Sequence, residues 1–121
     1  MLNAIINVTN LRLRTFIGFN PEEREKKQDV VINIEVHYPA DMACVTDQVD
    51  QAVNYKVITK AVIDLVENGQ FLLLEKLVAD VLELCHEHPS VTFAKVSVDK
   101  PHALRFADSV SLTLAWQKPS N

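Results

Sequence analysis

Two stretches in the first third of the chain alternate apolar and polar side chains with a period of two. The first places Leu11, Leu13 and Thr15 on one side, and the second places Val30, Ile32, Ile34 and Val36 on one side. Successive side chains of a strand point to opposite faces, so this period predicts two β-strands. The polar segment 18–28 between them contains glycine and proline and is longer than a tight hairpin needs. We expect it to be a loop, and such loops often contribute to function.

From about residue 54 the apolar positions recur every three or four residues. One helical face contains Val57, Ile58, Ala61, Val62, Leu65 and Val66, and Asn68-Gly69 follow as a stop signal. A second helix is predicted before Pro89, with Leu74, Leu77, Val78, Val81, Leu82 and Cys85 pointing inward. Alternation returns in residues 91–99 and 110–116, which predicts two further strands.

The predicted order of strand, strand, helix, helix, strand, strand indicates one α+β domain over residues 1–121, with a flexible tail at 118–121. Two helices can cover one face of a four-stranded antiparallel sheet. The other face and both edges of that sheet stay open, and an open edge invites pairing with another copy of the chain. We therefore expect a homo-oligomer.

The composition argues against two classes of partner. The 121 residues are 48% hydrophobic and 23% charged, which is ordinary for a folded domain. A net charge of -4 lacks the basic character that nucleic-acid binding requires, and no apolar stretch is long enough for a membrane span. The N-terminal residues lack the basic start and long apolar stretch of a secretory signal, so we expect a cytoplasmic location.

The two cysteines do not suggest a metal centre. Cys44 and Cys85 are far apart in sequence, and cytoplasmic chains with two cysteines usually keep both reduced. The run from Cys85 to His88 superficially resembles a ligand cluster. Consecutive side chains of a helix diverge by about 100°, so only the first and last of these four could share a face. We predict no metal site.

Two charged side chains are the first candidates for chemistry. Glu75 lies among apolar residues, where a carboxylate needs a partner such as the two parallel N–H donors of an amino-purine-like or pterin ring. Alternatively, it faces solvent in the first turn of a helix, where the helix dipole favours it. Lys100 precedes Pro101 at the end of the third strand, where partial burial would suit a general acid or base. The alternative is a solvated lysine at a strand end.

Longer runs of sequence add a more specific signal. They are Asn10–Gly18, His37–Asp41 and His102–Val110, together with the loop Gly18–Glu23, Asn54-Tyr55, Leu74-Glu75 and Asp99-Lys100-Pro101. With these runs the chain resembles the dihydroneopterin aldolase family over residues 4–117, and within it an epimerase branch. The resemblance implies the tunnelling fold, or T-fold, whose subunits close a β-barrel. It also implies tetrameric rings that stack in pairs to an octamer.

The resemblance places the family's site residues on this chain. They are Glu75, Leu74 and Val53 for substrate binding and Lys100, Glu23 and Tyr55 for catalysis. Glu75 would bind the amino and ring N–H groups of the pterin, and the Leu74 backbone would complete that edge. The family's site lies between subunits, so Tyr55 and Val53 would come from the neighbouring chain.

The implied substrate is a dihydropterin whose C6=N5 imine accepts the electron pair released when the C1'–C2' bond opens. No metal, flavin or pyridoxal cofactor is then needed. Loss of the aldehyde fragment makes the enzyme an aldolase, whereas re-addition to its other face gives the 2'-epimer. Two alternatives to an epimerase stay open, namely a true aldolase and a pterin-binding module without turnover.

Basic residues near the expected pocket favour epimerisation of dihydroneopterin triphosphate. Aldolases commonly have glycine after the Lys-Pro pair, whereas this chain has His102. A triphosphate on the substrate needs cations. The candidates are His102, Arg105 and Arg14, with Arg12 and Lys56 as further possibilities.

Overall fold

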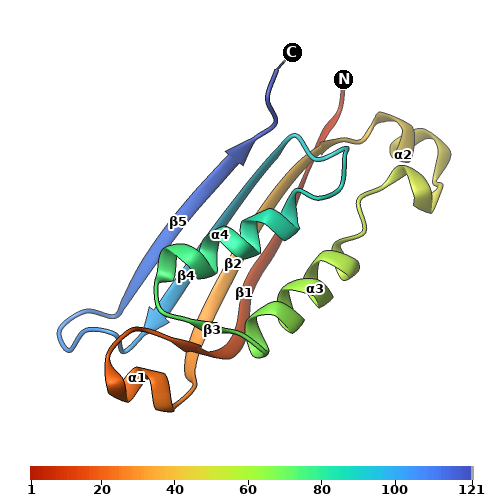
Figure 1. The fold of residues 1–121 in the computed structure, drawn as a ribbon. Helices are drawn as coiled ribbons and strands as arrows, with labels where there is room; N and C mark the ends of the chain where they lie inside the picture. Colours follow the sequence, from red (N-terminus) through yellow and green to blue (C-terminus); the bar gives the residue numbers. More distant parts are fainter. Residues whose placement is uncertain (121) are drawn as a thin grey trace.

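A computed structural model describes residues 1–120, and its elements form a five-stranded sheet with helices on one face (Figure 1). In chain order the elements are β1 (Asn3–Ile17), α1 (Pro21–Glu25), β2 (Gln28–Pro39), α2 (Asp41–Thr46), the 3-10 helix η1 (Val49–Gln51), α3 (Tyr55–Glu67), β3 (Gln70–Phe71), α4 (Leu74–Cys85), β4 (Phe93–Pro101) and β5 (Ser109–Gln117). The predicted α+β class and the two main helices are confirmed. None of the helices in residues 1–120 has the length and apolar character of a membrane span.

The sheet has five strands, so the prediction of a four-stranded antiparallel sheet was wrong. The strand order is β3-β1-β2-β4-β5, and β3 pairs in parallel with the end of β1 through Phe16↔Gln70 and Ile17↔Phe71. All other strand pairs are antiparallel. Two residues are too few to produce a period, which is why the sequence pattern did not reveal β3. The segment predicted as a loop also contains the short helix α1.

A bulge in β1 explains why that strand is longer than its alternation predicted. The register with β2 shifts between Val8 and Leu11, and Asn10 adopts a left-handed conformation with φ 55°. The backbone N–H of Asn10 donates to the side-chain oxygen of Asn33 at 2.9 Å. The extra residue resets the alternation, so both halves of the strand direct apolar side chains toward the helices.

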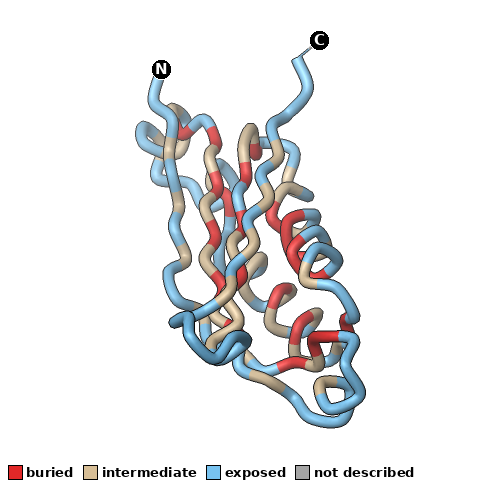
Figure 2. Tube along the Cα trace, turned by 90° about the vertical axis from the view of Figure 1, so that its left-hand side faces the viewer, coloured by how far each residue is buried: buried red, intermediate tan, exposed pale blue. Residues whose placement is uncertain are grey.

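The core lies between the helices and the sheet, where the buried segments gather in Figure 2. The sheet contributes Val30, Ile32, Ile34, Val36, Ala94, Val96 and Val98, and α4 contributes Leu77, Val78, Val81, Leu82 and Cys85. On α3, Val62 and Val66 are fully buried, whereas Val57 on the predicted apolar face is 63% exposed. Val57 belongs to the first turn, which borders an open hollow beside the end of α4.

Two long strand edges have no partner within residues 1–120. Because β3 pairs with only two residues of β1, the edge of β1 from Asn3 to Leu13 has no strand partner on that side, and the backbone N–H of Arg14 donates to Glu67 Oε2 at 2.6 Å. The outer edge of β5 is free as well. At the C-terminus, Lys118 hydrogen bonds to the carbonyl oxygens of Thr92 and Pro89, and residue 121 of the predicted tail lies outside the described residues.

Candidate active site

A hollow of about 310 Å³ opens at the end of the sheet farthest from the two termini, where α1, β3, the start of α4 and the end of β4 converge (Figure 1). We call it the Lys100 pocket. Its walls are Ile17, Gly18, Phe19, Glu23, Leu72, Leu73, Leu74, Glu75, Lys100, Ala103, Val110, Ser111 and Leu112. Four of the six predicted site residues therefore line one cavity, although they come from three different parts of the chain.

Lys100 and Glu23 form an ion pair at one side of this pocket. Lys100 Nζ lies 2.9 Å from Glu23 Oε2, and their side chains are 13% and 24% exposed. The hydrogen bond from Lys100 lowers the pKa of Glu23, against the opposing effect of burial. Lys100 is thus a half-buried amine held by a carboxylate, and the solvated strand-end alternative does not describe it.

Gln28 donates to the Glu23 carboxylate and Gly18 leaves room for it, and neither was predicted as a site residue. Gln28 Nε2 donates to the Ile17 carbonyl at 2.6 Å and to Glu23 Oε2 at 3.2 Å. Gly18 has φ +129°, and the Glu23 carboxylate occupies the space that a β-carbon on Gly18 would need. The polar loop with its glycine was the available signal, because only glycine readily adopts this backbone conformation.

Glu75 and Leu74 line the same pocket from the start of α4. Leu74 is half-buried, and the exposed Glu75 side chain lies in the first turn of the helix. The two interpretations of Glu75 are therefore compatible, since the carboxylate is in a favourable helix position and also lines the pocket that contains Lys100. In residues 1–120 no hydrogen-bonded partner of this carboxylate is present, so its oxygens are available to a ligand.

Tyr55 and Val53 lie outside the Lys100 pocket of their own chain. Tyr55 is 53% exposed and lines a hollow between α3 and β1, whereas Val53 is buried and borders a hollow at the end of α4. Asn54 between them caps α3, because its side-chain oxygen accepts hydrogen bonds from the backbone N–H groups of Lys56 and Val57. One chain thus assembles only part of the predicted residue set.

The predicted phosphate-binding residues lie at the margin of the pocket or away from it. Arg14 points elsewhere, with Nε 3.4 Å from Asp29 and Nη2 donating to the Lys27 carbonyl. His102, with φ 67°, and Arg105 belong to the exposed β4–β5 loop, which reaches the pocket wall through its Ala103. Arg12 and Lys56 do not line the Lys100 pocket either.

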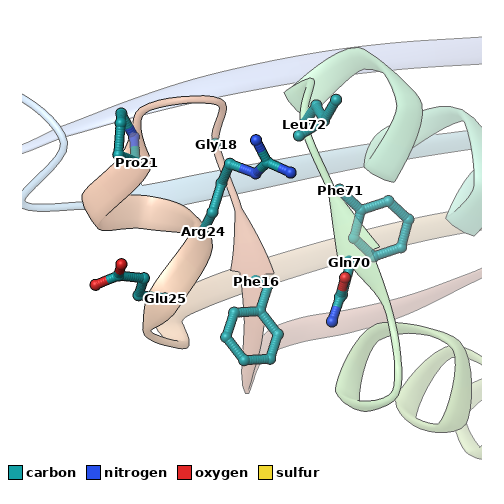
Figure 3. Close-up of a pocket in the computed structure, with 8 residues that line it drawn as sticks. All are labelled: Phe16, Gly18, Pro21, Arg24, Glu25, Gln70, Phe71 and Leu72. Atoms are coloured by element: carbon teal, nitrogen blue, oxygen red, sulfur yellow. The ribbon is translucent and has the colours of Figure 1, made fainter.

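A second hollow, of about 560 Å³, adjoins the Lys100 pocket and shares Gly18 and Leu72 with it (Figure 3). Its other lining residues are Phe16, Pro21, Arg24, Glu25, Gln70 and Phe71. Arg24 follows Glu23 on α1, and its guanidinium extends toward Phe71 and Leu72 in Figure 3. The short helix α1 therefore presents consecutive residues to two adjacent cavities.

No group of three His, Cys, Asp or Glu side chains in residues 1–120 is arranged to hold a metal ion. Cys85 from the superficial ligand cluster points into the core, and burial raises the pKa of its thiol to about 12. His86 instead stacks on Trp116 with ring centroids 4.0 Å apart. Cys85 and His86 are therefore packing residues of the fold.

The family model, the similar sequences and the similar structures all belong to one group of pterin enzymes. Residues 6–115 match the family model for dihydroneopterin aldolase. A dihydroneopterin triphosphate 2'-epimerase from Escherichia coli strain K12 is 56% identical over 95% of this chain and 96% of that protein. A protein of the same name from Pseudomonas aeruginosa is 54% identical over 95% of this chain and 94% of its own length. The structure of E. coli dihydroneopterin aldolase in complex with neopterin has a TM-score of 0.87 at 26% identity, covering 93% of this chain and 98% of that chain.

Proposed function

Because the chain belongs to the dihydroneopterin aldolase family, we propose that it is an isomerase that inverts C2' of dihydroneopterin triphosphate to give dihydromonapterin triphosphate. The relatives confirm the predicted epimerase function, since two proteins called dihydroneopterin triphosphate 2'-epimerase are 54% and 56% identical to this chain. The solved aldolase is more distant, at 26% identity.

The observation that supports the chemistry most directly is that Glu75 and Lys100 open onto one pocket. The Glu75 carboxylate accepts two parallel hydrogen bonds from the amino and ring N–H groups of the pterin. The Leu74 backbone contacts the rest of that edge of the ring. The heterocycle then extends across the pocket toward the Lys100–Glu23 pair. The neopterin in the structure of the E. coli aldolase relative belongs to the same class of ligand.

The reaction begins when a base removes the proton of the 2'-hydroxyl group. The C1'–C2' bond breaks, its electron pair moves into the C6=N5 imine, and N5 takes up a proton. An enol-like pterin and an aldehyde that still bears the triphosphate result. Lys100 exchanges protons with the 2'-oxygen and N5 through a water molecule, Glu23 orients that water and Lys100, and Tyr55 of a neighbouring copy binds the enol hydroxyl.

Epimerisation completes the cycle without net loss of atoms. The aldehyde turns over, C1' attacks its other face, N5 returns its proton, and the new 2'-alkoxide is protonated. Holding both fragments together favours re-addition over escape, because a retained aldehyde reacts at a high effective concentration. An aldehyde fragment whose triphosphate is bound by cations would be retained better than neutral glycolaldehyde. His102, Arg105 and Arg14 remain the proposed contacts, and Arg14 would have to release Asp29.

We also propose that the subunits form a T-fold barrel, with tetrameric rings paired as an octamer. Support comes from the two unpaired edges, because the edge of β1 from Asn3 to Leu13 could pair with β5 of the next copy. That arrangement would bring Tyr55 and Val53 to a neighbour's Lys100 pocket, which lacks them within one chain. A cytoplasmic location is proposed as well, in keeping with the free thiols of Cys44 and Cys85.

Product analysis tests the function. Purified protein is incubated separately with dihydroneopterin triphosphate and with dihydroneopterin, and the 2'-epimers and released aldehydes are quantified. Accumulation of the triphosphate epimer without matching aldehyde supports the proposal, whereas stoichiometric aldehyde release would make the enzyme an aldolase. A Lys100→Ala variant serves as the control, since it should bind pterin and show no turnover. Equal turnover by this variant would remove Lys100 from the chemistry.

A further inference from the structure

A hollow of about 500 Å³ runs along α3 beside β1, and its lining contains two lysines and no acidic residue. We call it the α3 hollow. It is lined by Asn7, Val8, Tyr55, Lys56, Thr59, Lys60 and Ile63. Lys56 and Lys60 are four residues apart on the helix, so their side chains are neighbours on one face. The proposed function assigns no role to Lys60 or to the hollow itself.

Within residues 1–120 the side chains of these two lysines pair with no carboxylate or carbonyl group, which distinguishes them from six of the other ten lysines and arginines. Lys76, Lys95, Lys100 and Arg14 are each paired with a carboxylate, and Lys27 and Lys118 donate to backbone carbonyls. Among residues 1–120, no carboxylate lies within 4.0 Å of Lys56 or Lys60. Like charges at this spacing destabilise a helix slightly, and a bound anion would relieve the repulsion.

Tyr55 connects this hollow to the chemistry. If Tyr55 of one copy acts at the Lys100 pocket of the next, the α3 hollow begins where the substrate's side chain reacts. The triphosphate is attached to the carbon next to C2', so it extends from the reaction centre near Tyr55. We propose that the α3 hollow of the neighbouring copy binds the triphosphate through Lys56 and Lys60, in addition to the contacts already proposed for His102, Arg105 and Arg14. The inference rests on the proposed function, and it explains how the aldehyde fragment is retained.

The hollow in Figure 3 is the competing place for the phosphates. It contains the cation of Arg24, but Glu25 also lines it and brings the formal charge of its lining to zero. Two aromatic rings, Phe16 and Phe71, also line it. The α3 hollow has a formal charge of two positive units and suits a polyanion better.

The test compares phosphorylated and unphosphorylated ligands with the intact protein. The double variant Lys56→Ala/Lys60→Ala should raise KM for dihydroneopterin triphosphate by about tenfold or more, because two charged contacts are lost. KM for dihydroneopterin should stay unchanged. Lys56→Arg/Lys60→Arg should restore triphosphate binding, and Lys118→Ala is the control for removing an exposed lysine elsewhere. The salt dependence of kcat/KM for the triphosphate should also be weaker in the alanine variant.

Equilibrium binding separates this inference from the proposed function. Titration with neopterin triphosphate and with neopterin measures the same preference without requiring turnover. Unchanged affinity of the alanine variant for neopterin triphosphate would overturn the inference, even if the wild type is an active epimerase. The inference would also be overturned if only Arg24→Ala, and not the double alanine variant, lost affinity for neopterin triphosphate. That result would assign the phosphates to the hollow of Figure 3. Absence of epimer from the wild type would instead refute the proposed function.

Discussion

Gly18→Ala is the substitution that most specifically perturbs the Lys100–Glu23 pair. A β-carbon on Gly18 would overlap the Glu23 carboxylate, and the backbone φ of +129° is one that alanine adopts only with strain. Glu23 would have to leave its position 2.9 Å from Lys100 Nζ. The pterin-binding wall formed by Leu74 and Glu75 is not altered directly.

The expected size of the effect follows from these contacts. Backbone strain costs about 1–3 kcal/mol, and loss of the hydrogen bond between the charged groups adds about 1 kcal/mol. The sum of about 2–4 kcal/mol corresponds to a fall in Tm of about 8–16 °C for a domain of this size. Misplacement of the proton-transfer groups by about 1 Å should reduce kcat about 100-fold. KM should change little, because Glu75 keeps its position.

The assay combines steady-state kinetics with thermal unfolding. Gly69→Ala is the matched control, because Gly69 is the other glycine of the chain and lines neither the Lys100 pocket nor the hollow of Figure 3. A β-carbon there would meet the Phe71 ring and lie 2.8 Å from the Leu65 carbonyl oxygen. This control should lose stability and retain kcat. If Gly18→Ala also retains wild-type kcat, the Glu23–Lys100 geometry does not govern the reaction.

Three further predictions follow from the same site. Glu75→Gln replaces an acceptor oxygen by a donor, so the affinity for neopterin measured by calorimetry should fall about 100-fold; a loss under threefold would contradict the bidentate contact. Co-expression of Lys100→Ala with Tyr55→Phe chains should produce mixed particles with up to about a quarter of wild-type activity, since sites between subunits then recover both residues; inactive mixtures that contain both chains would argue against shared sites. The lowered pKa of Glu23 means that the paired carboxylate stabilises the fold above its ordinary pKa of 4.5 and that this stability is lost as the pH falls through the lowered value. Urea unfolding between about pH 7 and pH 3 should therefore show a smaller loss in Glu23→Gln than in the wild type, and identical losses would contradict the assignment.

Much of the fold could be predicted because long periodic segments have one face in the core. The spacing of Leu77, Val78 and Val81 identified α4, and the alternation of β2 identified its buried face. Two features of the sheet escaped for local reasons. The two residues of β3 are too short for a period, and the bulge at Asn10 interrupts the alternation of β1.

The site was harder to predict from residue patterns alone. Lys100 and Glu23 are 77 positions apart in sequence, and only the folded chain brings them to 2.9 Å. Gln28 lies at the polar start of a strand, so nothing in its neighbourhood indicated a contact with Glu23. Long-range contacts of this kind depend on the register of several strands, which spacing within one segment does not determine.

The most direct test of the proposed chemistry is epimerisation of dihydroneopterin triphosphate in D₂O, followed by NMR of the isolated 2'-epimer. Breaking and re-forming the C1'–C2' bond leaves the hydrogen on C2' attached to the aldehyde carbon throughout. An epimer formed by the retro-aldol route should therefore retain protium at C2'. Deuterium at C2' would show that inversion occurs by removing and replacing that hydrogen, and it would contradict the retro-aldol route.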